Sequence, residues 1–139
     1  MFTDSCSSSI RVMTYNVRFD QVEDEQKQWR FRKDRLINLI EAHAPDLLGV
    51  QEPLSEQVAD LKVALSEFDD YGVGRDDGGS KGEFNTIFYR FARFESLDEG
   101  TFWLSEAPEF PGSKGWDANR TRICSWVKLH DRQTQEVLH

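Results

Sequence analysis

The chain has 139 residues, a length that fits a single domain. Its 38% hydrophobic, 30% charged and 12% aromatic residues are typical of a folded globular protein and exclude the intrinsically disordered class. The net charge of −8 disfavours tight, non-specific nucleic-acid binding, which requires a basic face, so a phosphate-bearing ligand would have to be held by local groups.

Residues 1–9 have the composition of a polar tail, and residues 10–139 that of the domain. No apolar stretch approaches the roughly 20 residues of a membrane span, and the tail lacks the hydrophobic region of a signal peptide. We therefore expect a cytoplasmic protein; the Cys6 run leaves secretion or lipid anchoring of a longer precursor open. Cys6 and Cys124 give no disulfide framework, and we expect Cys124 to be a buried thiol.

The first half of the domain has the pattern of a strand, a helix and a second strand. Residues 10–19 carry β-branched and aromatic side chains on both faces, which predicts a central strand. Apolar residues of 29–43 recur at helical spacing, and Pro45 ends that helix. Residues 46–51 are a short apolar run typical of a buried strand. A helix that joins two such strands predicts that they are parallel.

The second half begins with another helix and becomes rich in strands. Residues 55–68 predict an amphipathic helix with Ser55 as its N-cap. Residues 72–82 contain five glycines and predict a loop. The segments with strand composition are residues 84–89, 93–97, 101–104 and 123–129. Residues 107–119 form a long loop between them, for which we expect a functional role.

The final residues predict a hairpin, with a turn at 131–134 and a strand over 135–139. Because a domain seldom ends inside a strand, we expect this chain to be the N-terminal part of a longer, apparently truncated domain. A short edge strand is the alternative interpretation.

Two oxygen-bearing side chains follow the strands of the predicted parallel pair. Asn16 lies near the end of the first strand, and Glu52 comes directly after the second. Because ligands bind beyond the carboxyl ends of parallel strands, we expect these side chains to converge. One carboxylate with an amide carbonyl suits Mg²⁺. A turn-capping Asn16 and a solvated Glu52 are the alternatives that the residues alone leave open.

Three short motifs stand in order along the chain. They read TYNVR at residues 14–18, LGVQE at 48–52 and GEFNTIFYR at 82–90. Together they resemble the endonuclease/exonuclease/phosphatase superfamily, whose members have a DNase-I-like fold. The resemblance spans residues 10–139 and implies a four-layer α/β sandwich, with two packed sheets flanked by helices, of which this chain forms about the N-terminal half.

The resemblance also implies roles for four residues. It assigns Asn16 and Glu52 to a divalent-metal cluster, with Glu52 as the direct ligand of Mg²⁺ or Mn²⁺. Glu83 matches the glutamate that orients the catalytic histidine in DNase-I-like members, and Arg122 matches an arginine beside the scissile phosphate. A planar guanidinium can fork onto phosphate and stabilise developing charge. For Arg122 the alternative is a strand-end salt bridge.

The chain departs from the family pattern in two respects. Arg18 stands where AP-endonuclease-type members have an aspartate, which counts against that assignment. The family's catalytic histidine and its Gly-Asp-X-Asn and Asp-His motifs would lie downstream, and none of His43, His130 and His139 matches a family position. The resemblance thus implies a divalent-metal-dependent phosphoester hydrolase, either a phosphodiesterase or a phosphatase, and we expect the 139-residue chain to be inactive alone.

The expected partner is a phosphate-ester substrate, whether a small molecule, a lipid head group or a nucleotide. We expect its specificity contacts on the loops at 72–82 and 107–119. The alternative function is a non-catalytic interaction module, or a half-domain that pairs with another chain. In that case missing sheet strands would leave an apolar edge that favours self-association.

Overall fold

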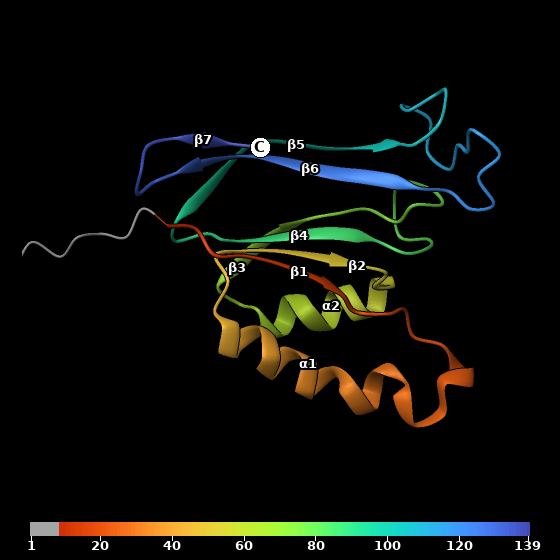
Figure 1. Ribbon diagram of the computed structural model, residues 1–139, viewed down its shortest axis with the longest axis horizontal. Coiled ribbons are helices and arrows are strands. Elements are labelled where there is room, and N and C mark those ends of the chain that lie inside the picture. Colours follow the sequence, from red (N-terminus) through yellow and green to blue (C-terminus); the bar gives the residue numbers. More distant parts are fainter. Residues whose placement is uncertain (1–8) are drawn as a thin grey trace, which may run out of the picture.

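The computed structural model describes residues 9–139, which fold into three layers: helices, a first sheet and a second sheet (Figure 1). The first sheet has the strand order β1 (Val12–Asn16), β2 (Leu47–Gln51), β4 (Asn85–Arg90) and β3 (Phe68–Tyr71). The second has the order β5 (Phe94–Trp103), β6 (Ile123–Asp131) and β7 (Val137–Leu138). The helical layer contains the 3₁₀ segment η1 (Val22–Lys27), α1 (Trp29–His43) and α2 (Ser55–Ala64).

The β1, α1 and β2 elements form the predicted parallel unit. In the register of the two strands, Val12 lies opposite Leu47 and Asn16 lies opposite Gln51. Helix α1 ends at His43; its C-cap, Ala44, has a left-handed φ of 43°, and the following proline prevents the helix from continuing. Both strands therefore end at the same edge of the sheet, on the right in Figure 1.

Within residues 9–139, strand β1 lies at the edge of its sheet rather than at its centre, and it is shorter than the strand predicted over residues 10–19. Apolar residues on both faces of a segment indicate that something covers it, but they do not say that a strand pairs with each side. Beside β1, a largely apolar groove of about 330 Å³ opens between the two sheets; Met13, Ile87 and Trp126 are among its lining residues.

Two apolar clusters hold the layers together. The cluster between the helices and the first sheet consists of Val17, Trp29, Leu36, Ile40, Leu48, Val50, Leu61, Leu65 and Phe88. The cluster between the sheets is smaller and consists of Tyr89, Phe94, Val127 and Leu129. Burial of this apolar surface is the main stabilising term of the fold. Within residues 9–139, no helix is both long and apolar enough to cross a membrane.

The second helix is shorter than predicted, because α2 ends at Ala64 and Phe68 begins strand β3. Phe68 has helical spacing from the helix, yet it packs on the same core from a strand that pairs with β4. The N-cap is Leu54 rather than Ser55. The Leu54 backbone N–H donates to Oε1 of Gln57 at 3.1 Å, so the capping group comes from within the helix.

Strand β5 is continuous where two strands, 93–97 and 101–104, were predicted. A Cβ on Gly100, within this strand, would lie 2.9 Å from the Trp126 ring, so the glycine makes room for an aromatic side chain on β6. Cys124 is exposed rather than buried, because it lies on the outer face of the second sheet. Cys6 and most of the predicted tail lie outside the described residues.

Candidate functional site

The four residues selected from the sequence surround one cavity of about 220 Å³, where the ends of both sheets meet. Its lining consists of Asn16, Gln51, Glu52, Arg75, Glu83, Asn85, Thr121, Arg122 and Ile123. The Asn85 amide donates to the carbonyl of Ile123 at 3.1 Å and thereby links the first sheet to the second beside the cavity. The predicted convergence of Asn16 and Glu52 is present, and Glu83 and Arg122 face the same space.

Asn16 holds the Glu52 carboxylate in place. Nδ2 of Asn16 donates to Oε1 of Glu52 at 2.7 Å, and Oδ1 of Asn16 accepts the backbone N–H of Arg18 at 2.9 Å. A backbone N–H can only donate, so this second bond fixes which end of the amide faces Glu52. Oε2 of Glu52 accepts no hydrogen bond from residues 9–139 and remains open to a ligand.

Glu52 has a left-handed backbone conformation, with φ of 69°. For a residue with a Cβ this conformation costs roughly 1–2 kcal/mol, and such outliers gather at functional sites. The strained turn directly after β2 brings the carboxylate back toward the end of β1. Arg18, with φ of 55°, makes a similar turn after β1 and directs its N–H at Asn16.

Glu83 forms an ion pair with Arg75, a residue that the sequence analysis did not select. Nη1 of Arg75 donates to Oε2 of Glu83 at 2.6 Å, and the two side chains are only 10% and 19% exposed. The carbonyl of Arg75 accepts the Trp103 indole N–H at 2.7 Å, which ties this loop to β5. Oε1 of Glu83 accepts no hydrogen bond from residues 9–139. The sequence feature that could have indicated this pair is an arginine that lies in the same glycine-rich segment as a glutamate.

Arg122 offers an exposed guanidinium to the cavity. No carboxylate of residues 9–139 forms an ion pair with it, which counts against the alternative of a strand-end salt bridge. Its carbonyl accepts the backbone N–H of Leu104 at 2.8 Å, so the backbone is fixed while the side chain stays available. An unpaired arginine at a cavity mouth is a suitable group for binding an anion.

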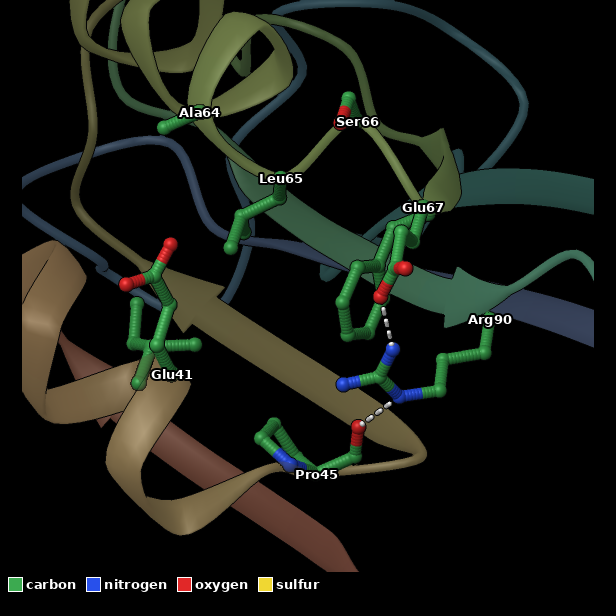
Figure 2. A pocket seen from close by; sticks show the side chains of 9 residues that line it. Glu41, Pro45, Ala64, Leu65, Ser66, Glu67 and Arg90 are labelled. Atoms are coloured by element: carbon green, nitrogen blue, oxygen red, sulfur yellow. Dashed lines mark hydrogen bonds and ion pairs between the residues drawn. The ribbon is translucent and has the colours of Figure 1, made fainter.

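In contrast to Arg122, Arg90 has its guanidinium engaged by neighbouring groups, in a cavity of about 190 Å³ at the other end of the sheet (Figure 2). Its guanidinium donates to the carbonyl of Pro45 at 2.9 Å and to Glu67 at 2.7 Å, and it also lies over the ring of Phe68. These contacts occupy Arg90 and join β4 to the loops around it. The contacts of Arg90 therefore stabilise the fold, and of these two arginines only Arg122 has a guanidinium available to a ligand.

Arg18 is also occupied. It makes two hydrogen bonds to Asp24, at 2.6 and 2.5 Å, which raise the pKa of Arg18 and hold the pKa of Asp24 well below its usual range. The side chain of Arg18 does not line the cavity, so its contribution to the site is the backbone N–H that it donates to Asn16.

The model of the Endonuclease/Exonuclease/phosphatase family matches residues 13–122, which is most of the chain. The chain belongs to this family. The predicted α/β fold class is thereby confirmed, and the three layers described above are the part of the four-layer sandwich that this chain contains.

Solved family members extend the comparison. An endonuclease/exonuclease/phosphatase of Bacteroides vulgatus is 43% identical, with a TM-score of 0.91 over 94% of this chain and 50% of its own. A mannosyl-6-phosphatase of Bacteroides thetaiotaomicron is 41% identical, with a TM-score of 0.89 over 94% of this chain and 49% of its own. An uncharacterised protein of Acanthamoeba polyphaga mimivirus is 26% identical over 93% of this chain and 24% of its own length. The chain spans about half the length of these solved relatives.

The donor set of this family member suits a hard cation with few protein ligands. Within residues 9–139, no group of three or more His, Cys, Asp or Glu side chains is arranged to hold a metal ion. Mg²⁺ does not require one, because it commonly binds one or two carboxylates and completes its shell with water and substrate phosphate. The open Oε2 of Glu52 in a polar cavity fits that mode of binding.

Proposed function

We propose that this chain carries the metal- and phosphate-binding part of the active site of a divalent-metal-dependent phosphoester hydrolase. The supporting observation is that the Glu52 carboxylate, held by Asn16, and the unpaired guanidinium of Arg122 face one cavity. Glu52 would hold a divalent cation, and Arg122 would bind a phosphate group in the same cavity.

Each residue has a distinct task in this proposal. Glu52 would hold Mg²⁺ or Mn²⁺ through Oε2, and Asn16 keeps the carboxylate in that orientation. When bound, the cation supplies positive charge at the phosphoryl oxygens and acidifies a water molecule. Arg122 forks onto the phosphoryl oxygens and stabilises charge that develops during attack. By fixing these oxygens, Arg122 orients the ester for in-line displacement.

Glu83 has a positioning task. Arg75 fixes one of its oxygens, and Oε1 is left to accept the N–H of an imidazole, as the family resemblance implies. None of the described histidines, His43, His130 and His139, lines the cavity. The residues described here therefore supply charge and orientation but no general base, and we propose that the 139-residue chain alone has no turnover.

For the substrate we propose a sugar monophosphate. The relative named as a mannosyl-6-phosphatase is 41% identical over 94% of this chain, which supports a sugar-phosphate ester over the other phosphate esters. The net charge of −8 disfavours long nucleic acids, whose binding depends on neutralising many phosphates. Of the two arginines that line the cavity, Arg75 is paired with Glu83 and Arg122 forms no ion pair with residues 9–139, an arrangement that suits a single phosphate group.

The test is phosphate release by the complete protein in Mg²⁺ or Mn²⁺. The substrates are mannose 6-phosphate, a nucleoside monophosphate, an inositol phosphate and a phospholipid, and we expect release from the sugar phosphate. Glu52→Gln removes the charge while keeping the shape, and should lower kcat/KM by about 100-fold or more. Glu41→Gln, an exposed carboxylate change at the other end of the sheet, is the matched control. No release from any ester, with metal affinity unchanged in Glu52→Gln, would overturn the proposal.

A second candidate is a non-catalytic half-domain that pairs with another copy of the chain. The observation that favours it is the unpaired edge of β1 beside an apolar groove of about 330 Å³. Phosphate release by the complete protein supports the enzyme; for the half-domain, light scattering of the 139-residue chain should show a dimer, and a monomer would contradict it.

A further inference from the structure

The segment 104–122 joins β5 to β6 and ends at Arg122, and it carries an exposed tryptophan. Trp116 is 68% exposed. Its φ is 52°, and that of the following residue, Asp117, is 59°, so two consecutive residues with side chains occupy the left-handed region. Each such residue costs on the order of 1 kcal/mol, and such strain often accompanies a binding role. A large apolar ring held in solvent contributes little to the folded core.

This loop is fixed to the loop that carries Arg75 and Glu83. A Cβ added to Gly112, which has φ of 80°, would lie 2.7 Å from the carbonyl oxygen of Asp76, so the two backbones are in direct contact. Within the loop, the hydroxyl groups of Ser105 and Ser113 share a hydrogen bond of 2.7 Å. The position of the loop beside the cavity is thus set by packing and hydrogen bonds rather than by its ends alone.

A short series of contacts connects Trp116 to Arg122. The backbone N–H of Leu104 donates to the carbonyl of Arg122 at 2.8 Å. The next residue, Ser105, packs against Gly115, since a Cβ on that glycine would lie 2.7 Å from the Cα of Ser105. The path consists of this hydrogen bond, this packing contact and two steps of about 3.8 Å between consecutive Cα atoms. Together they place the backbones of Trp116 and Arg122 within about 18 Å of each other. Two long side chains and a substrate between them can cover that separation.

We propose that Trp116 determines specificity by stacking on the sugar ring of the substrate while Arg122 binds its phosphate. This inference rests on the proposed phosphatase function and specifies how the sugar is recognised. In a hexose 6-phosphate the phosphate lies on an arm outside the ring, so a phosphate held at Arg122 leaves the ring free to reach the loop. The indole supplies a flat, rigid apolar surface with few rotatable bonds, which suits the C–H face of a pyranose.

The test compares an ester that has a ring with one that has none. The complete protein is assayed on mannose 6-phosphate and on glycerol 3-phosphate as wild type, Trp116→Ala and Trp116→Phe. We expect Trp116→Ala to lower kcat/KM for mannose 6-phosphate by about 10- to 30-fold, mainly through KM, because an aromatic stacking contact is worth on the order of that factor. The change for glycerol 3-phosphate should stay below about twofold, and Trp116→Phe should keep most of the activity.

Phe91→Ala is the control, because Phe91 is also exposed but lies after β4, at the opposite end of the sheets. A second measurement follows tryptophan emission during titration with mannose 6-phosphate, where the wild type should respond and Trp116→Phe should not. Suppose that the wild type hydrolyses mannose 6-phosphate, but that Trp116→Ala lowers kcat/KM equally for both esters or leaves it unchanged for both. The stacking proposal is then overturned and the phosphatase proposal stands. If the wild type hydrolyses neither ester, the stacking proposal and the choice of a sugar phosphate as substrate are both overturned.

Discussion

Replacing Glu52 by glycine and by alanine should reverse the usual order of stability of these two residues. Both variants lose the carboxylate and its hydrogen bond to Asn16, so those losses cancel in the comparison. They differ in the backbone, because residue 52 has φ of 69°. Glycine adopts this conformation freely, whereas alanine retains the clash of its Cβ.

The expected magnitude follows from two opposing terms. The left-handed conformation costs alanine roughly 1–2 kcal/mol. Glycine loses more chain entropy on folding, a disadvantage of roughly 0.5–1 kcal/mol. The difference leaves the Glu52→Gly variant more stable than Glu52→Ala by about 0.5–1 kcal/mol. In ordinary helix or strand positions alanine is favoured, so the sign itself is informative.

The assay is urea unfolding of the complete protein, with both variants at equal concentration and without divalent metal. The midpoints should differ in favour of glycine, while the slopes stay equal, because the same surface is exposed on unfolding. Both variants should lack phosphatase activity. A more stable Glu52→Ala would contradict the left-handed turn at the end of β2 and the view that function maintains its strain.

Three further substitutions test other parts of the account. Arg75→Gln should destabilise the protein by about 2 kcal/mol in urea unfolding, since it leaves Glu83 in a partly buried position without its partner; an unchanged midpoint would contradict this. Arg122→Lys should lower kcat/KM by about 10-fold or more while shifting stability by less than about 0.5 kcal/mol, because only a guanidinium forks onto phosphate; equal turnover would argue against phosphate contact. The hydrogen bond from Arg93 lowers the pKa of the buried Asp131 carboxyl in the folded protein. The pair therefore stabilises the fold at pH values above about 4, the pKa of an aspartate in the unfolded chain, and this stabilisation is lost as the pH falls toward the pKa of Asp131 in the folded protein. Asp131→Asn should cost about 3–5 kcal/mol at neutral pH and flatten the acid limb of stability against pH; an unaltered acid limb would refute that assignment.

Half of the candidate site could be predicted from strand ends, because Asn16 ends β1 and Glu52 directly follows β2; Glu83 and Arg122 precede strands and came from the family resemblance. Asn16 and Glu52 were expected to meet once the chain was read as a parallel strand pair, and the register of β1 and β2 puts them together. Their mutual hydrogen bond and the left-handed turn at Glu52 were not predictable, because no residue pattern marks a non-glycine residue with positive φ. Arg75 was missed because its partner Glu83 lies across a glycine-rich loop whose course only the structure reveals.

The errors in the fold have similar local causes. Phe68 continues the apolar spacing of α2, and spacing alone does not distinguish one more helical turn from a strand that packs on the same core. Strand β5 was predicted as two strands, although Gly100 within it accommodates the Trp126 ring across the sheet. The edge position of β1 depends on which strands are neighbours, which is a property of the tertiary structure and not of the segment.

Binding of Mn²⁺ to the complete protein is the measurement that decides whether Glu52 holds a divalent cation at the cavity shared with Arg122. Paramagnetic resonance counts bound Mn²⁺ in the wild type, in Glu52→Gln and in the Glu41→Gln control. We expect Glu52→Gln to weaken Mn²⁺ affinity by at least about 10-fold and the control to bind Mn²⁺ as the wild type does. Equal affinity in all three proteins would contradict it.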